Sequence, residues 1–158
     1  MEFRRLTADD SARLTAFYAS LSDEVNWFYR PFADPTEEVL REHLVGGDEG
    51  RHIILGIVED SGTIVGHAFI LSVASEDPTF GIGLHQSVHG RGWGRKLTVA
   101  ILEEADRLGL PLVTLTVMKE NVRAKALYES LGFRLTGECD FRSPGDSWCM
   151  ERRGPADP

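Results

Sequence analysis

A glycine-rich loop joins a strand-like run to a helical run in the middle of this sequence. Residues 80–84 are apolar and strand-like, and Leu97 begins a run with the apolar spacing of a helix. Between them, glycine occupies every second position in the order His89-Gly90-Arg91-Gly92-Trp93-Gly94. A helix that begins here directs unpaired N–H groups and the positive end of its dipole into the loop, and glycine lets a ligand approach them closely. The segment therefore predicts an α/β fold with an anion-binding loop.

Three cationic side chains, Arg91, Arg95 and Lys96, accompany this loop. Cations at a helix N-terminus oppose the helix dipole, so an anion held between them and the helix end would explain their presence. The alternative is a flexible turn followed by an ordinary solvated first turn of helix. The whole chain carries a net charge of −8, which argues against a broad basic surface for nucleic acid or anionic membranes. We therefore predict a phosphate-bearing ligand and no nucleic-acid or membrane partner.

The length of 158 residues suits one domain with a single core. We predict that this domain spans 1–153 and that 154–158 form a short C-terminal tail. No apolar run is long enough to span a bilayer, and no signal-peptide pattern opens the sequence, so a cytoplasmic location is expected. Cys139 and Cys149 flank a turn at 143–146 and can face each other across a hairpin. Because disulfides are unusual in the cytoplasm, we expect two half-buried thiols.

Apolar periodicity and turn signals divide the chain into strands and helices. The predicted strands lie near 3–6, 53–59, 63–73, 80–88, 112–117 and on both sides of the 143–146 turn. The predicted helices span about 10–20, 36–45, 92–108 and 121–131, with a loop at 27–32. Right-handed crossover makes strands 80–88 and 112–117 parallel neighbours. This order predicts an α/β (α+β) fold, with a mixed, largely antiparallel sheet of about seven strands flanked by about four helices, and with the glycine loop at the carboxyl edge of one strand.

Two motifs in this order resemble the signatures of the GCN5-related N-acetyltransferase (GNAT) superfamily. The first, Gln/Arg-x-x-Gly-x-Gly/Ala, corresponds to residues 89–94, with His89 in place of Gln or Arg, so His89 is expected to contact a phosphate of the cofactor more weakly than those residues do. The second, Asn-x-x-Ala-x-x-x-Tyr-x-x-x-Gly-Phe, is present as Asn121, Ala124, Tyr128, Gly132 and Phe133. The resemblance covers about residues 1–153. It departs from some members at Thr116, where ribosomal-protein acetyltransferases place a glutamate base.

The resemblance implies acetyl-CoA as the acyl donor, with no metal. Main-chain amides of 90–95 would hold its pyrophosphate, and backbone groups of Ile82, Gly83 and Leu84 would pair with its pantetheine arm as an added strand does. The glycines at 81 and 83 fit either this close approach or tight packing within the protein, and the sequence leaves both open. Asn121 is expected to contact the cofactor arm, to cap its helix, or both.

Proton transfer needs a donor and a base. A phenol stays protonated at neutral pH, so Tyr128 is the predicted general acid for the departing thiolate. A histidine side chain can accept a proton near neutral pH, so His85 is the candidate base, and Glu76 and Asp77 acting through water are alternatives. Trp27 and Tyr29 are predicted to line the acceptor pocket, although core packing beneath a loop is an open alternative. The five histidines are dispersed along the chain, so no metal site is predicted.

We therefore expect an N-acetyltransferase in which a primary amine of a small molecule or a protein attacks acetyl-CoA directly in a ternary complex. The alternative is a catalytically silent acyl-CoA-binding sensor or regulatory module. A nucleotide-binding domain is disfavoured, because the loop lacks the Lys-Ser/Thr ending of a P-loop. A homodimer is also considered, formed by pairing of an exposed last strand with its copy.

Overall fold

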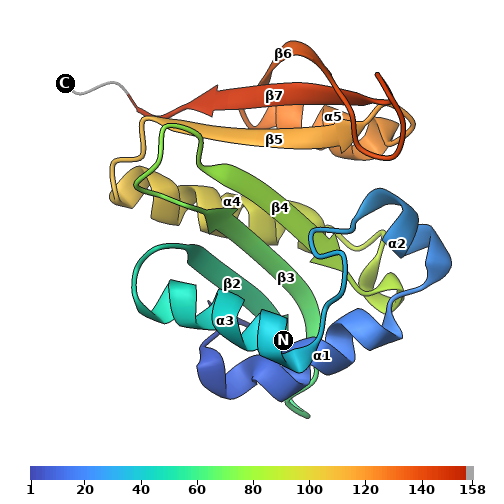
Figure 1. The fold of residues 1–158 in the computed structure, drawn as a ribbon, viewed down its shortest axis with the longest axis vertical. Helices are drawn as coiled ribbons and strands as arrows, with labels where there is room; N and C mark the ends of the chain where they lie inside the picture. Colours follow the sequence, from blue (N-terminus) through green and yellow to red (C-terminus); the bar gives the residue numbers. More distant parts are fainter. Residues whose placement is uncertain (156–158) are drawn as a thin grey trace.

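The centre of the molecule is a seven-stranded mixed sheet with helices on both faces (Figure 1). The computed structural model describes residues 1–155. The strands are β1 (Glu2–Arg5), β2 (Ile53–Val58), β3 (Ile64–Leu71), β4 (Thr79–Leu84), β5 (Leu112–Met118), β6 (Arg134–Cys139) and β7 (Ser147–Arg153). They lie in the order β1-β2-β3-β4-β5-β7-β6, and every pair is antiparallel except β4 and β5. The predicted fold class and the predicted parallel pair are confirmed.

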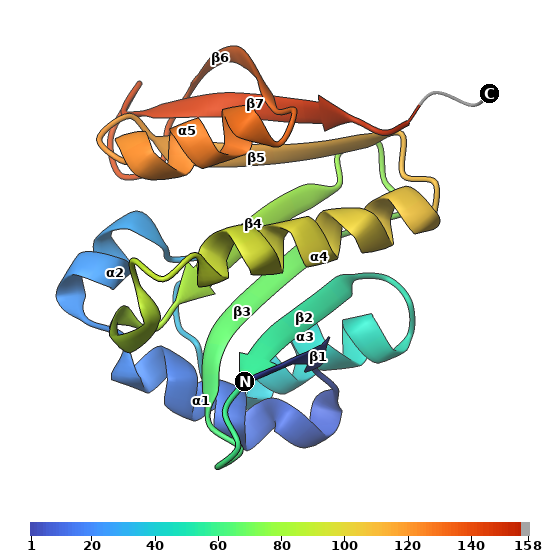
Figure 2. The ribbon, with the colours of Figure 1, turned by 180° about the vertical axis from the view of Figure 1, so that it is seen from behind.

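Five α-helices cover this sheet in the described part of the chain. They are α1 (Ser11–Ser20), α2 (Asp23–Phe28), α3 (Glu37–Asp48), α4 (Trp93–Arg107) and α5 (Val122–Ser130). Helices α1 and α3 lie on one face, and α4 and α5 lie on the other (Figure 2). Ile53, Leu55 and Ile57 of β2 join the core under α4, whereas Ile54 and Val58 join the core under α1 and α3. All six residues of β2 are therefore buried, as expected for a strand covered on both faces.

The parallel pair β4 and β5 is joined only at its beginning. Thr79 and Thr114 are the single pair in register, and the Thr114 N–H donates to the Pro78 carbonyl oxygen at 2.8 Å. Beyond this point the two strands diverge (Figure 1). The sheet therefore has a split along the carboxyl-terminal part of β4, next to the loop that leads into α4.

The main chain of β4 presents alternate residues to this split. The His85 N–H donates to the Val65 oxygen of β3 at 2.8 Å. Because main-chain groups alternate in direction along a strand, Gly83 also faces β3, where it is in register with His67. Ile82 and Leu84 face the side of β5, with no partner on that strand. An unpaired strand edge thus lies inside the sheet.

Two helix boundaries differ from the prediction. The loop expected at 27–32 is in part helix α2, which starts because the Ser22 hydroxyl accepts from the Val25 N–H at 3.2 Å. Helix α3 continues through Gly46 and Gly47 instead of ending before them. A Cβ on Gly46 would lie 2.4 Å from the His52 ring, so this glycine allows close packing and does not stop the helix.

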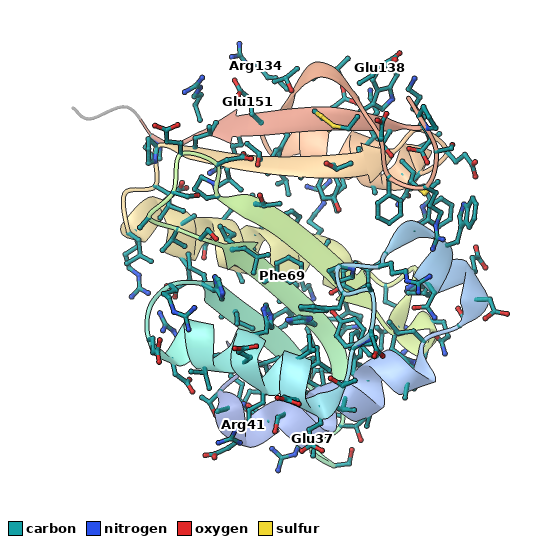
Figure 3. All side chains as sticks on the ribbon, viewed as in Figure 1. Glu37, Arg41, Phe69, Arg134, Glu138 and Glu151 are labelled. Atoms are coloured by element: carbon teal, nitrogen blue, oxygen red, sulfur yellow. A yellow bond between two sulfur atoms is a disulfide. The ribbon has the colours of Figure 1, made fainter. Side chains whose placement is uncertain are left out.

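Three further expectations are wrong. The strand predicted at 80–88 ends at Leu84, and 86–88 form a 3-10 turn. The last strand, β7, lies between β5 and β6, so an exposed last strand is not available for pairing with a second copy. Cys139 and Cys149, expected as thiols, form a disulfide between paired strands, with Cα atoms 5.6 Å apart; it is the yellow bond beside β7 in Figure 3.

Residues 156–158 of the predicted tail lie outside the described residues. Gly154, where the tail was expected to begin, still donates its N–H to the Pro111 oxygen at 3.0 Å. No helix in residues 1–155 has the length and apolar character needed to cross a membrane.

Candidate functional site

The glycine loop has the backbone shape that the sequence predicted for it. Gly90 and Gly92 have φ values of 75° and 80°, in the left-handed region, and Gly92 is the N-cap of α4. A Cβ at either position would meet no atom within 4 Å. The loop therefore needs glycine for its turn, and the space in front of it is open.

Main-chain N–H groups beside this open space are left without acceptors. None of the six N–H groups of 90–95 donates to a residue within 1–155. The first helical bond at this end runs from Lys96 N–H to the Gly92 oxygen at 3.2 Å. Unpaired amides at the start of a 15-residue helix, together with its dipole, form an anion-binding site.

The basic side chains around the loop are partly engaged elsewhere. The Arg95 guanidinium donates to the Ser130 hydroxyl of α5 at 3.0 Å, and the Lys96 ammonium lies 4.6 Å from the centre of the Trp93 ring. His89 donates from Nε2 to the Leu84 oxygen at 3.0 Å. His89 thus ties the loop to the end of β4, and Arg91 is exposed beside the free amides.

The glycines of β4 are explained by packing on the opposite face. A Cβ on Gly81 would lie 2.3 Å from the Phe69 ring, and one on Gly83 would lie 2.0 Å from the Tyr29 ring. Tight packing, one of the two readings left open, therefore accounts for both residues. Ile82 and Leu84 are the β4 residues whose main chains face the split.

Tyr128 lies on the α4 and α5 side of the sheet. Its ring packs at 5.8 Å from both Phe80 and Phe133, and only 8% of the residue is exposed. Burial raises the pKa of Tyr128, which keeps the phenol protonated. Its hydroxyl forms no hydrogen bond with residues 1–155. Every fully enclosed side-chain oxygen or nitrogen in this range has a hydrogen-bond partner, so the Tyr128 hydroxyl is not fully enclosed. The hydroxyl is therefore free to donate to a ligand.

The residue that opens α5 takes one of its two predicted roles. The Asn121 side-chain oxygen accepts from the Ala124 N–H at 3.3 Å and caps the helix. Its expected contact with the cofactor arm stays a prediction.

Trp27 and Tyr29, the two residues predicted to line the pocket for the acceptor amine, differ in how deeply they are buried. Trp27 is 43% exposed; its indole N–H donates to Glu120 at 3.4 Å, and the Arg142 guanidinium lies 4.5 Å from its ring centre. Tyr29 is half-buried over Gly83 and hydrogen-bonds to Tyr18. Trp27 thus lies on the exposed side of α2, where it contacts the β6–β7 loop, and Tyr29 lies next to β4.

The residues considered as the general base are poorly placed to accept a proton from an amine. His85 Nδ1 accepts from the Ser87 N–H at 3.1 Å, and its Nε2 contacts the Gln86 amide at 3.1 Å, so both nitrogens are engaged in a local turn. Glu76 and Asp77 precede β4, whereas the glycine loop follows it, about 20 Å away for a strand of this length. Thr116 is exposed on β5, 3.8 Å from the Cys139 sulfur.

Three residues escaped the sequence reasoning. Tyr18, His43 and His67 form a buried hydrogen-bonded group that includes Tyr29. The signal was His67, a single histidine inside the otherwise apolar run 64–71. In residues 1–155, no cluster of three or more His, Cys, Asp or Glu side chains is arranged to hold a metal ion.

A sheet split after one parallel pair, with an amide cradle where the next helix begins, defines the acyl-CoA N-acyltransferase class of fold. The chain belongs to the Acetyltransferase (GNAT) family, which it matches over residues 15–133. The family resemblance inferred from the two motifs is confirmed.

Similar proteins carry acetyltransferase names. N-alpha-acetyltransferase RimI of Mycobacterium tuberculosis is 33% identical over 137 residues, covering 83% of this chain and 75% of that protein. The alanine N-acetyltransferase of ribosomal protein bS18 from Escherichia coli K12 is 28% identical over 92 residues, covering 58% of this chain and 62% of that relative. The match thus spans about three fifths of the E. coli protein. PaiA N-acetyltransferase of Thermoplasma acidophilum in complex with coenzyme A shares the fold, with a TM-score of 0.76 at 18% identity over 96% of this chain and 98% of that chain.

Proposed function

We propose that this protein is an N-acetyltransferase that transfers the acetyl group of acetyl-CoA to a primary amine. The observation that carries the proposal is the set of unpaired amides at 90–95 beside the free edge of β4. A diphosphate fits the amides, and an extended amide-bearing arm fits the strand edge. Coenzyme A contains both groups, and the Thermoplasma structure with the same fold has coenzyme A bound.

In this proposal the cofactor lies along the split. Its pyrophosphate accepts hydrogen bonds from the 90–95 amides, and its pantetheine arm pairs with the main chains of Ile82 and Leu84. The Leu84 oxygen is already an acceptor for His89, so the Ile82 groups and the Leu84 N–H remain for the arm. This arrangement places the thioester near the end of β4, on the side of Tyr128.

Direct attack by an amine gives a tetrahedral adduct, whose collapse breaks the C–S bond. Tyr128 donates its phenolic proton to the departing thiolate, and its raised pKa keeps that proton in place until then. A main-chain N–H near Leu84 is suited to stabilise the oxyanion. Trp27 and Tyr29 are assigned to the acceptor side, with Trp27 on the exposed side of α2 and Tyr29 closer to β4.

A panel of amines tests this proposal. Alkyl amines, polyamines, amino acids and peptides with free N-termini are incubated with acetyl-CoA, and release of free thiol is measured. Thiol release that depends on the amine and yields the N-acetyl product supports the proposal. Tight acetyl-CoA binding with no thiol release above the blank for any amine favours the silent sensor module instead.

A further inference from the structure

Three buried side chains and the half-buried Tyr29 form a continuous hydrogen-bonded chain from the surface of β4 at Gly83 to helix α3. The Tyr29 and Tyr18 hydroxyls lie 2.5 Å apart, and His67 Nδ1 lies 2.8 Å from the Tyr18 hydroxyl and 3.2 Å from the Tyr29 hydroxyl. His67 Nε2 lies 3.1 Å from His43 Nε2. His67 is fully buried on β3, and Phe69, labelled in Figure 3, packs its ring 5.3 Å from the imidazole.

The contact between the two imidazoles fixes how protons are arranged along this chain. Two Nε2 atoms at hydrogen-bond distance require one to carry a proton and the other to be bare. If His67 donates, its Nδ1 is bare and accepts from Tyr18, which accepts from Tyr29. If His43 donates, each of these bonds reverses and the Tyr29 O–H points outward. Both arrangements satisfy every group, and they differ by transfer of one proton from the Tyr29 end to the His43 end.

Both rings are held neutral, as this reversal requires. Burial lowers the pKa of His67, and the nearby His43 lowers it further. Burial, with a smaller effect of His52, lowers the pKa of His43 to about 4. The other groups facing His43 are His52, stacked at 5.8 Å, and the Phe32 and Phe69 rings, with Arg51 acting on His52.

The two ends of the chain open to different surroundings. Tyr29 packs over Gly83, next to the strand edge assigned to the thioester. Burial raises the pKa of Tyr29, so its phenol stays protonated. His43 Nδ1 has no hydrogen-bond partner in residues 1–155. Every fully enclosed side-chain nitrogen in this range has a partner, so His43 Nδ1 is exposed to solvent. The chain therefore connects the acceptor site with the surface at α3.

We propose that Tyr29, Tyr18, His67 and His43 form a proton relay that serves as the general base of the transfer reaction. This proposal rests on the proposed acetyltransferase function. The adduct nitrogen gives its proton to the Tyr29 oxygen; the Tyr29 proton passes to Tyr18, and the Tyr18 proton passes to His67 Nδ1. The Nε2 proton of His67 passes to His43 Nε2, and the Nδ1 proton of His43 leaves to water. Tyr128 supplies the thiolate proton and recovers one from solvent. After the product leaves, His43 Nδ1 takes a proton from water and the reverse shift releases the outward Tyr29 proton to water in the empty site, so the relay returns to its starting arrangement and the protons balance.

The relay explains why neither His85 nor Thr116 needs to act as the base. His85 is engaged in its own turn, and Thr116 has no basic group. Tyr29 is the only relay member assigned to contact the acceptor. Tyr18, His67 and His43 act through it.

A pair of variants at His43 separates proton transfer from structural support. His43→Gln places an amide near the former Nε2 and keeps a hydrogen bond to His67, but an amide does not relay a proton. His43→Phe removes both. We expect kcat to fall at least about 10-fold and equally in the two variants, with acetyl-CoA affinity unchanged and the Tm lowered more by Phe. Wild-type kcat in His43→Gln, or a large loss in His85→Gln alone, overturns the relay.

Two further variants and one spectrum complete the test. Tyr18→Phe should reduce kcat less than Tyr29→Phe, because the contact between Tyr29 and His67 Nδ1 bypasses Tyr18, and His52→Gln should retain wild-type kcat as the matched control. Imidazole 15N shifts at pH 7 need no turnover, so they test the relay even if no amine is acetylated. Shifts averaged between both tautomers in His43 and His67 support it, and a cationic or single fixed tautomer overturns it.

Discussion

Replacing Gly92 by alanine should impair cofactor binding far more than it impairs folding. Gly92 has φ near 80°, and an added Cβ meets open space, so the intrinsic cost is backbone strain alone. That cost is about 1–2 kcal/mol for an L-residue, which lowers the Tm of a chain of this size by about 2–8 °C. If the loop relieves the strain by turning, its amides lose their common direction.

The effect on binding follows from the amides. A hydrogen bond to a charged group contributes about 1.5–3 kcal/mol, so loss of one amide–phosphate bond weakens acetyl-CoA binding about 10- to 100-fold. Isothermal titration calorimetry measures this affinity, and thermal unfolding without ligand measures the strain.

Gly109→Ala is the matched control. Gly109 follows the other end of α4 and has φ of 73°, and a Cβ there would also meet no atom within 4 Å. The two variants should therefore lose similar stability, and only Gly92→Ala should lose affinity. Equal acetyl-CoA affinity in the two variants would refute the amide cradle at 90–95.

Three other predictions concern the proton donor, an ion pair and the disulfide. Tyr128→Phe should lower kcat about 100-fold or more, with acetyl-CoA affinity nearly unchanged in titration calorimetry; wild-type kcat would remove Tyr128 as the acid. Burial raises the pKa of Asp10, but hydrogen bonds from Arg4, the Thr7 N–H and Arg13 outweigh it and hold the pKa at about 2. Because the pKa of Asp10 is lower in the folded state than its value near 4 in the unfolded chain, the ionised carboxylate stabilises the fold above pH 4. The free energy of unfolding should therefore fall by about 2 kcal/mol as the pH drops from 4 through 2. Urea unfolding across this pH range should show a shallower fall in the free energy of unfolding for Asp10→Asn. The Cys139–Cys149 disulfide closes a sequence separation of 10, so reduction should lower the free energy of unfolding by about 2–3 kcal/mol, and identical urea midpoints with and without reductant would contradict it.

The features that sequence reasoning predicted correctly are those determined by local chemistry. The alternating glycines at 90, 92 and 94 required a turn into a helix, and the structure has that turn. Asn121 was expected to cap α5, to contact the cofactor arm, or both, and the structure shows the cap. In each case a few neighbouring residues determine the backbone.

The features that sequence reasoning missed depend on residues far apart in the chain. Gly46 resembles a helix stop until His52 is seen packed against it, and Gly83 resembles a ligand contact until Tyr29 is seen over it. The group of Tyr18, Tyr29, His43 and His67 joins residues from four separate segments. No local pattern indicates such a contact, although a histidine in an apolar strand shows that a buried polar partner is required.

The split between β4 and β5 connects the two parts of the proposed site. The Ile82 main-chain groups and the Leu84 N–H face the split without partners on β5, whereas the Leu84 oxygen accepts from His89. A row of free main-chain groups along a strand edge favours an extended amide-bearing molecule over a compact one. The same split lies between Tyr128, which packs against Phe80 on one face of the sheet, and Tyr29, which packs over Gly83 on the other. In the proposed mechanism a thioester held there has the proton donor Tyr128 on one side and Tyr29, the first residue of the relay, on the other, so the missing strand pairing would both bind the cofactor and separate the acid from the base.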